Sequence, residues 1–362
     1  MLYNLLFPLH ESVSFFNIFR YITFRAAMAA LTSFLISLLL GPYVIRKLKS
    51  LKVGEKINKG DSAALDTLHH SKKDTPTMGG ILILVAIVFS TLIWADIANK
   101  FIWVVLFSTI WLGITGFIDD YLKQTKKNAK GLTAKTKLTS QALLGLILGV
   151  VFLLYFQSSL KLDIPFLKNV VLDLNGMYII FVILVIAGTS NAVNLTDGLD
   201  GLAIGIVVMV ALAFSVLCYV SGHIRLSEYL LVPFISGSGE LTVFCASILG
   251  AGLGFLWFNC YPASIFMGDV GSLALGGALG TVALLIRKEL LLVMVGGIFV
   301  LEALSVILQV CSFRLTKKRI FRIAPLHHHF QFLNWPENKV IVRFWIIAGL
   351  LAIMTIVTLK VR

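Results

Sequence analysis

The sequence predicts an all-α, polytopic membrane protein, and three observations carry this prediction. Of the 362 residues, 58% are apolar and 14% are charged, which excludes disordered chains and disulfide scaffolds. Stretches such as 139–156 and 202–220 contain no charged residue, and about 20 apolar residues suffice to cross a bilayer core. The longest connection, 46–77, has only 32 residues. No soluble catalytic domain fits there, so we expect residues 1–362 to form a single membrane-embedded domain.

Ten stretches are apolar and long enough to be expected transmembrane helices. In chain order they are 23–45, 78–98, 101–120, 139–158, 174–191, 202–220, 240–259, 270–287, 290–313 and 340–359.

Basic residues are concentrated in alternate connections. The loops 46–77, 121–138 and 314–339 together carry twenty Lys and Arg, and the opposite side receives nine. Positively charged loops favour the cytoplasm, so both termini are expected to be periplasmic. Because no nucleic-acid-binding motif is present, we expect no nucleic-acid partner. The net charge of +13 is then expected to reflect topology and attraction for anionic membrane lipid or a phosphorylated substrate.

Five aspartates fall on the face that this topology places in the cytoplasm. They are Asp119, Asp120, Asp197, Asp200 and Asp269. Carboxylates that converge without counter-charges repel one another unless a cation lies between them, and Mg²⁺ prefers oxygen ligands. The alternative is that short acids only cap helix ends, but intramembrane and interfacial acids are often functional. The sequence therefore predicts a magnesium site formed by these acids.

The local spacing of these acids suggests how each could act. Asp119 and Lys123 are four residues apart, so a helix would place a carboxylate and a phosphate-binding ammonium on one face. Asn194, Asp197 and Asp200 recur every third residue, which would align an amide and two acids along one stripe of a helical turn.

Glycines flank Asp269 at the start of an expected helix. Gly268 and Gly271 would let phosphate oxygens approach the exposed N–H groups of the helix start, where Asp269 could hold their metal.

Two further segments complete this face. Residues 71–80 supply Lys and Thr side chains, and residues 325–330 contain three consecutive histidines. Zinc ligands on a helix usually recur at i and i+4, so the histidines suit phosphate or sugar contacts and proton transfer better. A solvated basic loop is the alternative for both segments.

Glu302 lies near the middle of an apolar stretch, where a charge costs about 2.5–3.5 kcal/mol. We expect a structural polar contact for it in preference to a direct catalytic role. Gln309, seven residues on, shares its helical face.

Five sequence blocks resemble a known family. SKKDTPTMGG, GFIDDYLK, NAVNLTDGLDGLA, GLGFLWFNCYPASIFMGDVGSLALGG and APLHHHF are similar to the motifs of the phospho-N-acetylmuramoyl-pentapeptide transferases, or translocase I, in the polyprenyl-phosphate N-acetylhexosamine-1-phosphate transferase superfamily. The acidic motifs are shared across the superfamily, and TPTMGG with APLHHHF indicates the muramoyl-pentapeptide branch.

The resemblance implies a UMP-releasing phosphoglycosyl transferase of the bacterial cytoplasmic (inner) membrane, with its active face in the cytoplasm. It would move phospho-N-acetylmuramoyl-pentapeptide from UDP-MurNAc-pentapeptide to undecaprenyl phosphate with Mg²⁺, giving lipid I, the first lipid-linked peptidoglycan intermediate. The resemblance is also compatible with a homodimer. Either a direct transfer or a covalent route through an attacking carboxylate is compatible with it.

The resemblance also implies site residues. Asp269 would be the Mg²⁺ ligand, with Asp119 and Asp120 as further candidates, and Asp119 would deprotonate or orient the lipid phosphate. Lys123 and Lys137 would contact phosphates, and His328 would join the catalytic set. The implied substrate site further comprises Lys72 (or its neighbour Lys73), Thr77, Asn194, Asp197, Asp200, Asn259, Phe266, Gly268, Ser272, Gln309, Ala324, His327 and His329.

Two other functions are weighed against this one. A sister transferase would use UDP-N-acetylglucosamine, and the APLHHHF block argues against it. A cation-coupled transporter would also be polytopic with intramembrane acids, but transporters place such sites near the bilayer midplane and often contain repeats. Here the acids lie at one membrane face, and the sequence shows no repeat.

Overall fold

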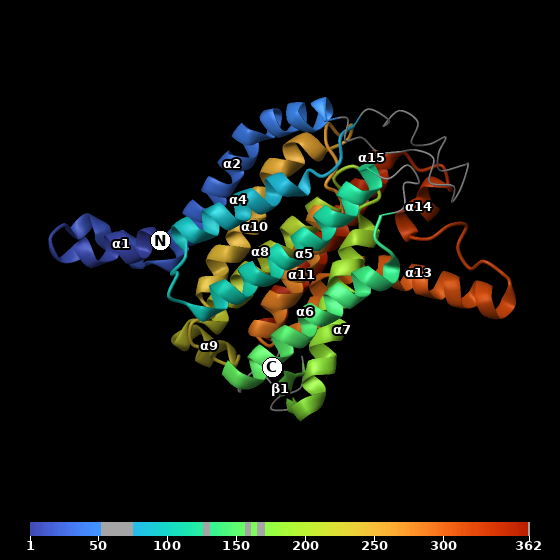
Figure 1. Cartoon of the computed structure of the whole chain (residues 1–362). Coiled ribbons are helices and arrows are strands. Elements are labelled where there is room, and N and C mark those ends of the chain that lie inside the picture. Colours follow the sequence, from blue (N-terminus) through green and yellow to red (C-terminus); the bar gives the residue numbers. More distant parts are fainter. Residues whose placement is uncertain (52–74, 126–130, 156–160, 165–170, 361–362) are drawn as a thin grey trace.

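The protein is a bundle of helices in the computed structural model, which describes residues 1–51, 75–125, 131–155, 161–164 and 171–360 (Figure 1). The longer helices run side by side, and the short helix α1 extends from one side of the bundle near the N-terminus (Figure 1). The only strands in the described residues form one small antiparallel hairpin, with Leu162 opposite Leu172. The predicted all-α fold class is therefore confirmed.

The elements follow one another along the chain in this order. They are α1 (Leu2–Leu6), η1 (Phe7–Glu11), η2 (Ser14–Arg20), α2 (Ile22–Ser50), α4 (Gly80–Trp94), α5 (Lys100–Thr125), α6 (Ala134–Tyr155), β1 (Lys161–Asp163), β2 (Val171–Asp173), η5 (Asn175–Met177), α7 (Tyr178–Thr196), α8 (Leu202–Ser221), α9 (Ile224–Leu230), α10 (Glu240–Asn259), α11 (Gly268–Leu285), α12 (Glu289–Val295), α13 (Gly297–Thr316), α14 (Leu326–Gln331), α15 (Glu337–Val357) and η6 (Thr358–Lys360).

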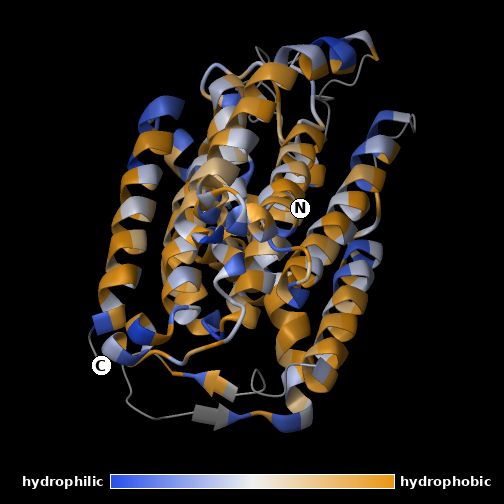
Figure 2. Cartoon of the chain, turned by 90° about the vertical axis from the view of Figure 1, so that its left-hand side faces the viewer, coloured by the Kyte–Doolittle hydropathy of each residue, from blue (hydrophilic) through white to orange (hydrophobic). Residues whose placement is uncertain are grey.

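Nine helices within the described residues are long and apolar enough to cross a membrane. The stretch predicted at 78–98 forms α4, an apolar helix of only 15 residues. Apolar residues cover most of the helix surfaces, and hydrophilic residues gather largely at helix ends and in connections (Figure 2). The protein is thus a multi-pass membrane protein, while the count of ten spans and their orientation stay predictions.

The stretch predicted as one helix at 290–313 is divided in two. Helix α12 ends at Val295, and α13 begins at Gly297. Two consecutive glycines lie at the break, and each costs about 1 kcal/mol relative to Ala inside a helix. Beyond the break, α13 projects away from the bundle on the side of α14 (Figure 1). The prediction of a continuous helix there was wrong because it weighed apolar length and not the glycine pair.

Helix α11 is the centre of the bundle. Of its 18 residues, 89% are buried, and it packs against α5 and α7. Its sequence is rich in Gly and Ala, and small residues let neighbouring helices approach closely. Since α11 begins at Gly268, Asp269 lies at one end of the most buried helix, and its backbone is held by packing on several sides.

Charged groups at the opposite end of α11 fix the connection to α12. Lys288 Nζ donates to Asp163 Oδ2 at 2.6 Å, which joins the hairpin to this turn. The Tyr178 hydroxyl donates to Glu289 Oε1 at 3.0 Å, and burial raises the pKa of the Glu289 carboxyl to about 7. This end of the bundle is therefore stabilised independently of the end that carries Asp269.

A buried ion pair joins α2 to α10. The Arg25 guanidinium donates two hydrogen bonds to the Glu240 carboxylate, at 2.6 and 2.5 Å. Both residues are buried, so each charge depends on the other for compensation.

Breaking this pair should destabilise the fold without touching the acidic end of α11. We expect Arg25→Met to lower the free energy of unfolding by about 3–5 kcal/mol, because the Glu240 charge stays buried and unpaired. The double variant Arg25→Met/Glu240→Met should lose less than the single variant. Thermal melting in detergent measures both, and a double variant less stable than Arg25→Met would contradict this account.

Candidate functional site

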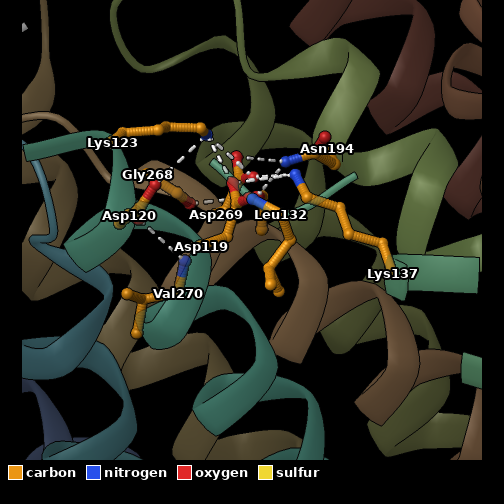
Figure 3. Close-up of polar contacts among 10 residues, drawn as sticks. Asp119, Asp120, Lys123, Leu132, Lys137, Asn194, Gly268, Asp269 and Val270 are labelled. Atoms are coloured by element: carbon orange, nitrogen blue, oxygen red, sulfur yellow. Dashed lines mark hydrogen bonds and ion pairs between the residues drawn. The ribbon is translucent and has the colours of Figure 1, made fainter. Parts of the chain in front are cut away.

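Three carboxylates meet where α5 ends and α11 begins (Figure 3). Asp119 and Asp120 lie near the C-terminal end of α5, and Asp269 lies in the first turn of α11. Asp119 and Asp120 are buried, and one ligand oxygen from each of the three residues lies within 4.8 Å of the others. A cluster of this kind requires compensating positive charge.

The two helices can meet here because glycines occupy the contact. A Cβ on Gly116, one turn before Asp119, would lie 2.1 Å from the carbonyl oxygen of Asp269. Gly268 has a φ of +72°, and a Cβ there would lie 2.5 Å from Asp120 Oδ2. Asp120 Oδ2 in turn accepts the Val270 N–H at 3.2 Å. Asp120 thus occupies the N-terminal end of α11, where a negative charge is favoured.

Two lysines neutralise most of the negative charge. Lys123 Nζ lies 2.6 Å from Asp119 Oδ2 and 3.0 Å from Asp269 Oδ2, which confirms the predicted shared helical face of Asp119 and Lys123. Lys137, from the first turn of α6, places Nζ 2.8 Å from Asp119 Oδ2 and 2.5 Å from Asp269 Oδ2. Three carboxylates and two ammonium groups leave this cluster with a formal charge of about −1, counted with ordinary ionisation states.

Neutral donors fix the remaining carboxylate oxygens. Asn194 Nδ2, in the last turn of α7, donates to Asp269 Oδ1 and to Ser272 Oγ, both at 2.8 Å. The Leu132 N–H donates to Asp119 Oδ1 at 2.6 Å (Figure 3). Each acid is therefore held in one orientation by groups from several helices.

The predicted stripe of Asn194, Asp197 and Asp200 does not form. Helix α7 ends at Thr196, so the two acids lie in the following turns. Asp200 is buried, and its Oδ2 accepts the Ala263 N–H at 2.9 Å. Among the described residues, three of the five acids share the cluster. The chain turns out of the helix between Asn194 and Asp200, so Asp197 and Asp200 are not part of this close cluster, and their place on the same face stays a prediction.

The three histidines have three different environments. His327 is buried, its backbone N–H donates to Glu302 Oε1 at 3.1 Å, and its ring Nδ1 lies 3.2 Å from Glu302 Oε2. His328 Nδ1 lies 2.8 Å from Gln331 Oε1, and His329 Nδ1 accepts the Arg322 N–H at 3.2 Å. The expected polar contact of Glu302 is therefore present.

His327 also contacts the turn that follows α7. A Cβ on Gly198 would lie 2.3 Å from His327 Nε2. The buried ring thus connects α13, through Glu302, with the turn that carries Asp197 and Asp200.

Two residues implied for the substrate site, Asn259 and Gln309, use their side-chain amides to bind backbone groups of the protein. Asn259 accepts the Gly201 N–H at 3.0 Å and donates to the Ile265 carbonyl at 2.7 Å. Gln309 accepts two backbone N–H groups, from Ile320 and Phe321, and donates to the Phe321 carbonyl at 3.0 Å. Spacing gives no signal for either residue, because their backbone partners lie in irregular connections and not on a shared helical face.

The remaining implied residues lie in three places. Phe266 donates its N–H to the Pro76 carbonyl and accepts the Gly79 N–H, each at 2.8 Å, which pairs the segments that enter α11 and α4. Thr77 Oγ1 lies 3.0 Å from the position of a Cβ on Gly268. Ala324 lies in the connection before α14, and Lys72 and Lys73 fall outside the described residues. The roles of all these residues stay predictions.

The donor set suits a hard divalent cation. The cluster offers only carboxylate oxygens from Asp119, Asp120 and Asp269, held close together by fixed helices. Mg²⁺ binds through one or two carboxylates together with substrate phosphates and water. The lysines that now neutralise the acids are also suited to phosphate oxygens.

Comparisons with known proteins agree with one another. Residues 102–287 match the glycosyl transferase family 4, and residues 72–84 match phospho-N-acetylmuramoyl-pentapeptide-transferase signature 1. The chain is similar to the phospho-N-acetylmuramoyl-pentapeptide-transferases of Desulforapulum autotrophicum and Desulfatibacillum aliphaticivorans, each 53% identical over 364 residues, and to that of Citrifermentans bemidjiense, 52% identical over 363 residues. Each alignment covers 100% of both chains.

The glycine at the start of α11 gives a direct test of this geometry. We expect Gly268→Ala to lower transferase activity at least about tenfold, because the Cβ strains a positive φ by about 1–3 kcal/mol and displaces Asp120. Gly188→Ala is the matched control, since nothing lies within 4 Å of its Cβ position. Activity per folded molecule, normalised by melting curves, is the measurement, and equal activities of the two variants would contradict the prediction.

Proposed function

Since the chain belongs to the phospho-N-acetylmuramoyl-pentapeptide-transferase family, we propose that it transfers phospho-MurNAc-pentapeptide from UDP-MurNAc-pentapeptide to undecaprenyl phosphate. The products are UMP and lipid I. The observation that carries this proposal is the cluster of three carboxylates and two lysines where α5, α6, α7 and α11 meet. Such a cluster offers groups for a pyrophosphate, a metal and a nucleophile at the end of the bundle.

The reaction is a substitution at phosphorus. An oxygen of the lipid phosphate attacks the phosphorus attached to the sugar, and the bond from that phosphorus to the bridging oxygen breaks, so that UMP leaves with this oxygen. Negative charge develops on the departing UMP, and positive groups that lie nearby lower the barrier. Lys123 and Lys137 supply two such groups, and both face Asp119 and Asp269.

Asp269 is the proposed Mg²⁺ ligand, with Asp119 and Asp120 within reach of the same position. Bound Mg²⁺ would neutralise the pyrophosphate and polarise its phosphoryl oxygens. Asn194 donates to Asp269 Oδ1, and Lys137 bonds to Oδ2, so both oxygens of this carboxylate are oriented before substrate binds.

Asp119 is the proposed group that deprotonates or orients the lipid phosphate. It is buried, its Oδ1 accepts the Leu132 N–H, and its Oδ2 lies 2.6 Å from Lys123 Nζ and 2.8 Å from Lys137 Nζ. A carboxylate placed this way could also attack the pyrophosphate itself in a covalent route. Both routes use the same geometry.

The proposed site lies on the cytoplasmic face of the bacterial inner membrane. This placement rests on the twenty basic residues of the three loops at that end, since positive charge favours the cytoplasmic side. A water-soluble nucleotide and a membrane-anchored phosphate can both reach a site at helix ends. The nucleotide could not reach a site at the bilayer midplane. The match to signature 1 favours the muramoyl-pentapeptide branch over a transferase that uses UDP-N-acetylglucosamine.

Purified protein should release UMP when given UDP-MurNAc-pentapeptide, undecaprenyl phosphate and Mg²⁺. Chelation of the metal should stop release, because the leaving charge is then not neutralised. UDP-N-acetylglucosamine serves as the competing donor, and inverted and right-side-out vesicles report the accessible face. Faster release from UDP-N-acetylglucosamine, or release only when nucleotide is outside right-side-out vesicles, would overturn the respective assignment.

Substitution of the two acids should separate their roles. Asp119→Asn should lower turnover by about a hundredfold or more while nucleotide affinity stays within about twofold, because a group that acts in the transition state changes kcat and not ground-state binding. Asp269→Asn should lose turnover and also weaken Mg²⁺-dependent nucleotide binding. Calorimetry with UDP-MurNAc-pentapeptide, with and without Mg²⁺, measures the difference. Equal loss of binding in both variants would instead indicate one shared metal site.

A further inference from the structure

Helices α6 and α7 approach one another closely beneath the carboxylate cluster. Lys137, Gln141, Gly145 and Gly149 recur every fourth residue of α6 and so lie on one face. A Cβ on Gly145 would lie 2.7 Å from Ile183 Cα, so the backbones of the two helices are in contact. Along this face, small residues lie deep in the bundle and Lys137 lies at the end that carries the site.

A hydrogen bond between side-chain amides lies between the glycines and the site. Asn191 Nδ2 donates to Gln141 Oε1 at 2.8 Å, and it also donates to the Ala187 carbonyl at 2.8 Å. Gln141 is fully buried. Gln141 is one turn from Lys137, and Asn191 is one turn from Asn194, so the amide pair is one turn below the two residues that bind Asp269 from α6 and α7.

Helix α7 is also fixed against α11. A Cβ on Gly276 would lie 2.7 Å from Ser190 Cα. The residue next to Asn191 therefore touches the helix that carries Asp269. Asn194 on α7 also donates to Asp269 Oδ1 and Ser272 Oγ on α11, so hydrogen bonds as well as packing set the register of α7 against α11. The register of α6 against α7 needs a directional contact of its own.

We propose that Gln141 and Asn191 are positioning residues that fix this second register. Their hydrogen bond holds α6 against α7 at the level at which Lys137 Nζ reaches Asp269 Oδ2 and Asn194 Nδ2 reaches Asp269 Oδ1. The proposal rests on the proposed function, which gives Lys137 and Asp269 their roles toward phosphate and metal.

Packing alone would not require this pair. Small residues let two helices approach but resist sliding weakly, whereas an amide hydrogen bond is directional and is lost on a shift of about 1 Å. Gln141 Nε2 is buried with no hydrogen-bond partner in the described part of the chain. A buried amide with an unsatisfied donor is destabilising, because the N–H loses its hydrogen bond to water without replacement. The presence of Gln141 at this cost is explained if its amide fixes α6 against α7 and so positions Lys137 in the site.

The test is a double-mutant cycle in the purified full-length protein. Gln141→Met and Asn191→Leu each remove the hydrogen bond at similar volume, and we expect each to lower kcat for UMP release about tenfold with KM for UDP-MurNAc-pentapeptide within about twofold. The double variant should lose about tenfold and not a hundredfold, because both changes remove one interaction.

Thr91→Val is the matched control. Thr91 and Ser247 form a buried hydrogen bond at 2.9 Å between α4 and α10, away from the cluster. This variant should lower the melting temperature and leave kcat per folded molecule within about twofold of the parent.

The outcomes separate this proposal from the proposed function. If the parent protein releases no UMP, the proposed function is wrong. The same double-mutant cycle is then measured as kcat with the phospho-sugar donor that the parent accepts. With an active parent, full kcat in Gln141→Met or Asn191→Leu, or additive losses in the double variant, would overturn the positioning role. Failure of both single variants to fold would do so too, since it would assign the pair to stability.

Discussion

The fold depends on the charge balance around Asp269. Three carboxylates and two ammonium groups lie where four helices end, and Asp119 is fully buried among them. In a membrane protein neither set of charges is tolerable alone at such burial, because an unpaired buried ion is strongly destabilising. Helices α5, α6, α7 and α11 each contribute part of the balance. The ends of these four helices must therefore meet, and the glycines at their contacts allow the approach.

This balance also prepares the cluster for a charged substrate. Lys123 and Lys137 each bond to Asp119 and Asp269. Phosphate oxygens can replace the carboxylates as partners of the lysines, and a divalent cation can replace the lysines as partner of the carboxylates. The net charge of the cluster then changes little. An arrangement of this kind needs little reorganisation during the reaction. Preorganised electrostatic groups are effective in catalysis for this reason. The site also lies at helix ends, where a nucleotide from water and a phosphate on a lipid can meet.

Residues around the cluster mostly shape its surroundings. Asn259, Gln309 and Asp200 bind backbone groups of irregular connections, and Glu302 accepts the backbone N–H of His327 and lies next to its ring. Each acts on a connection that lacks regular hydrogen bonding of its own, where buried backbone groups must find other partners. Polar residues implied by family resemblance thus have a structural function in this chain, beside any contact with substrate.

The sequence by itself determined the membrane class, most helix positions, the pairing of Asp119 with Lys123 and the place of Asp269 at a helix start, because these follow from composition and short-range periodicity. The break before Gly297 and the turn of Asp200 toward Ala263 had to come from the structure. The same holds for the arrival of Lys137 at Asp269 and for the bond between Gln141 and Asn191. Helices that are apolar on all sides do not reveal which face meets which neighbour. The tertiary packing decides that, and with it which polar groups meet.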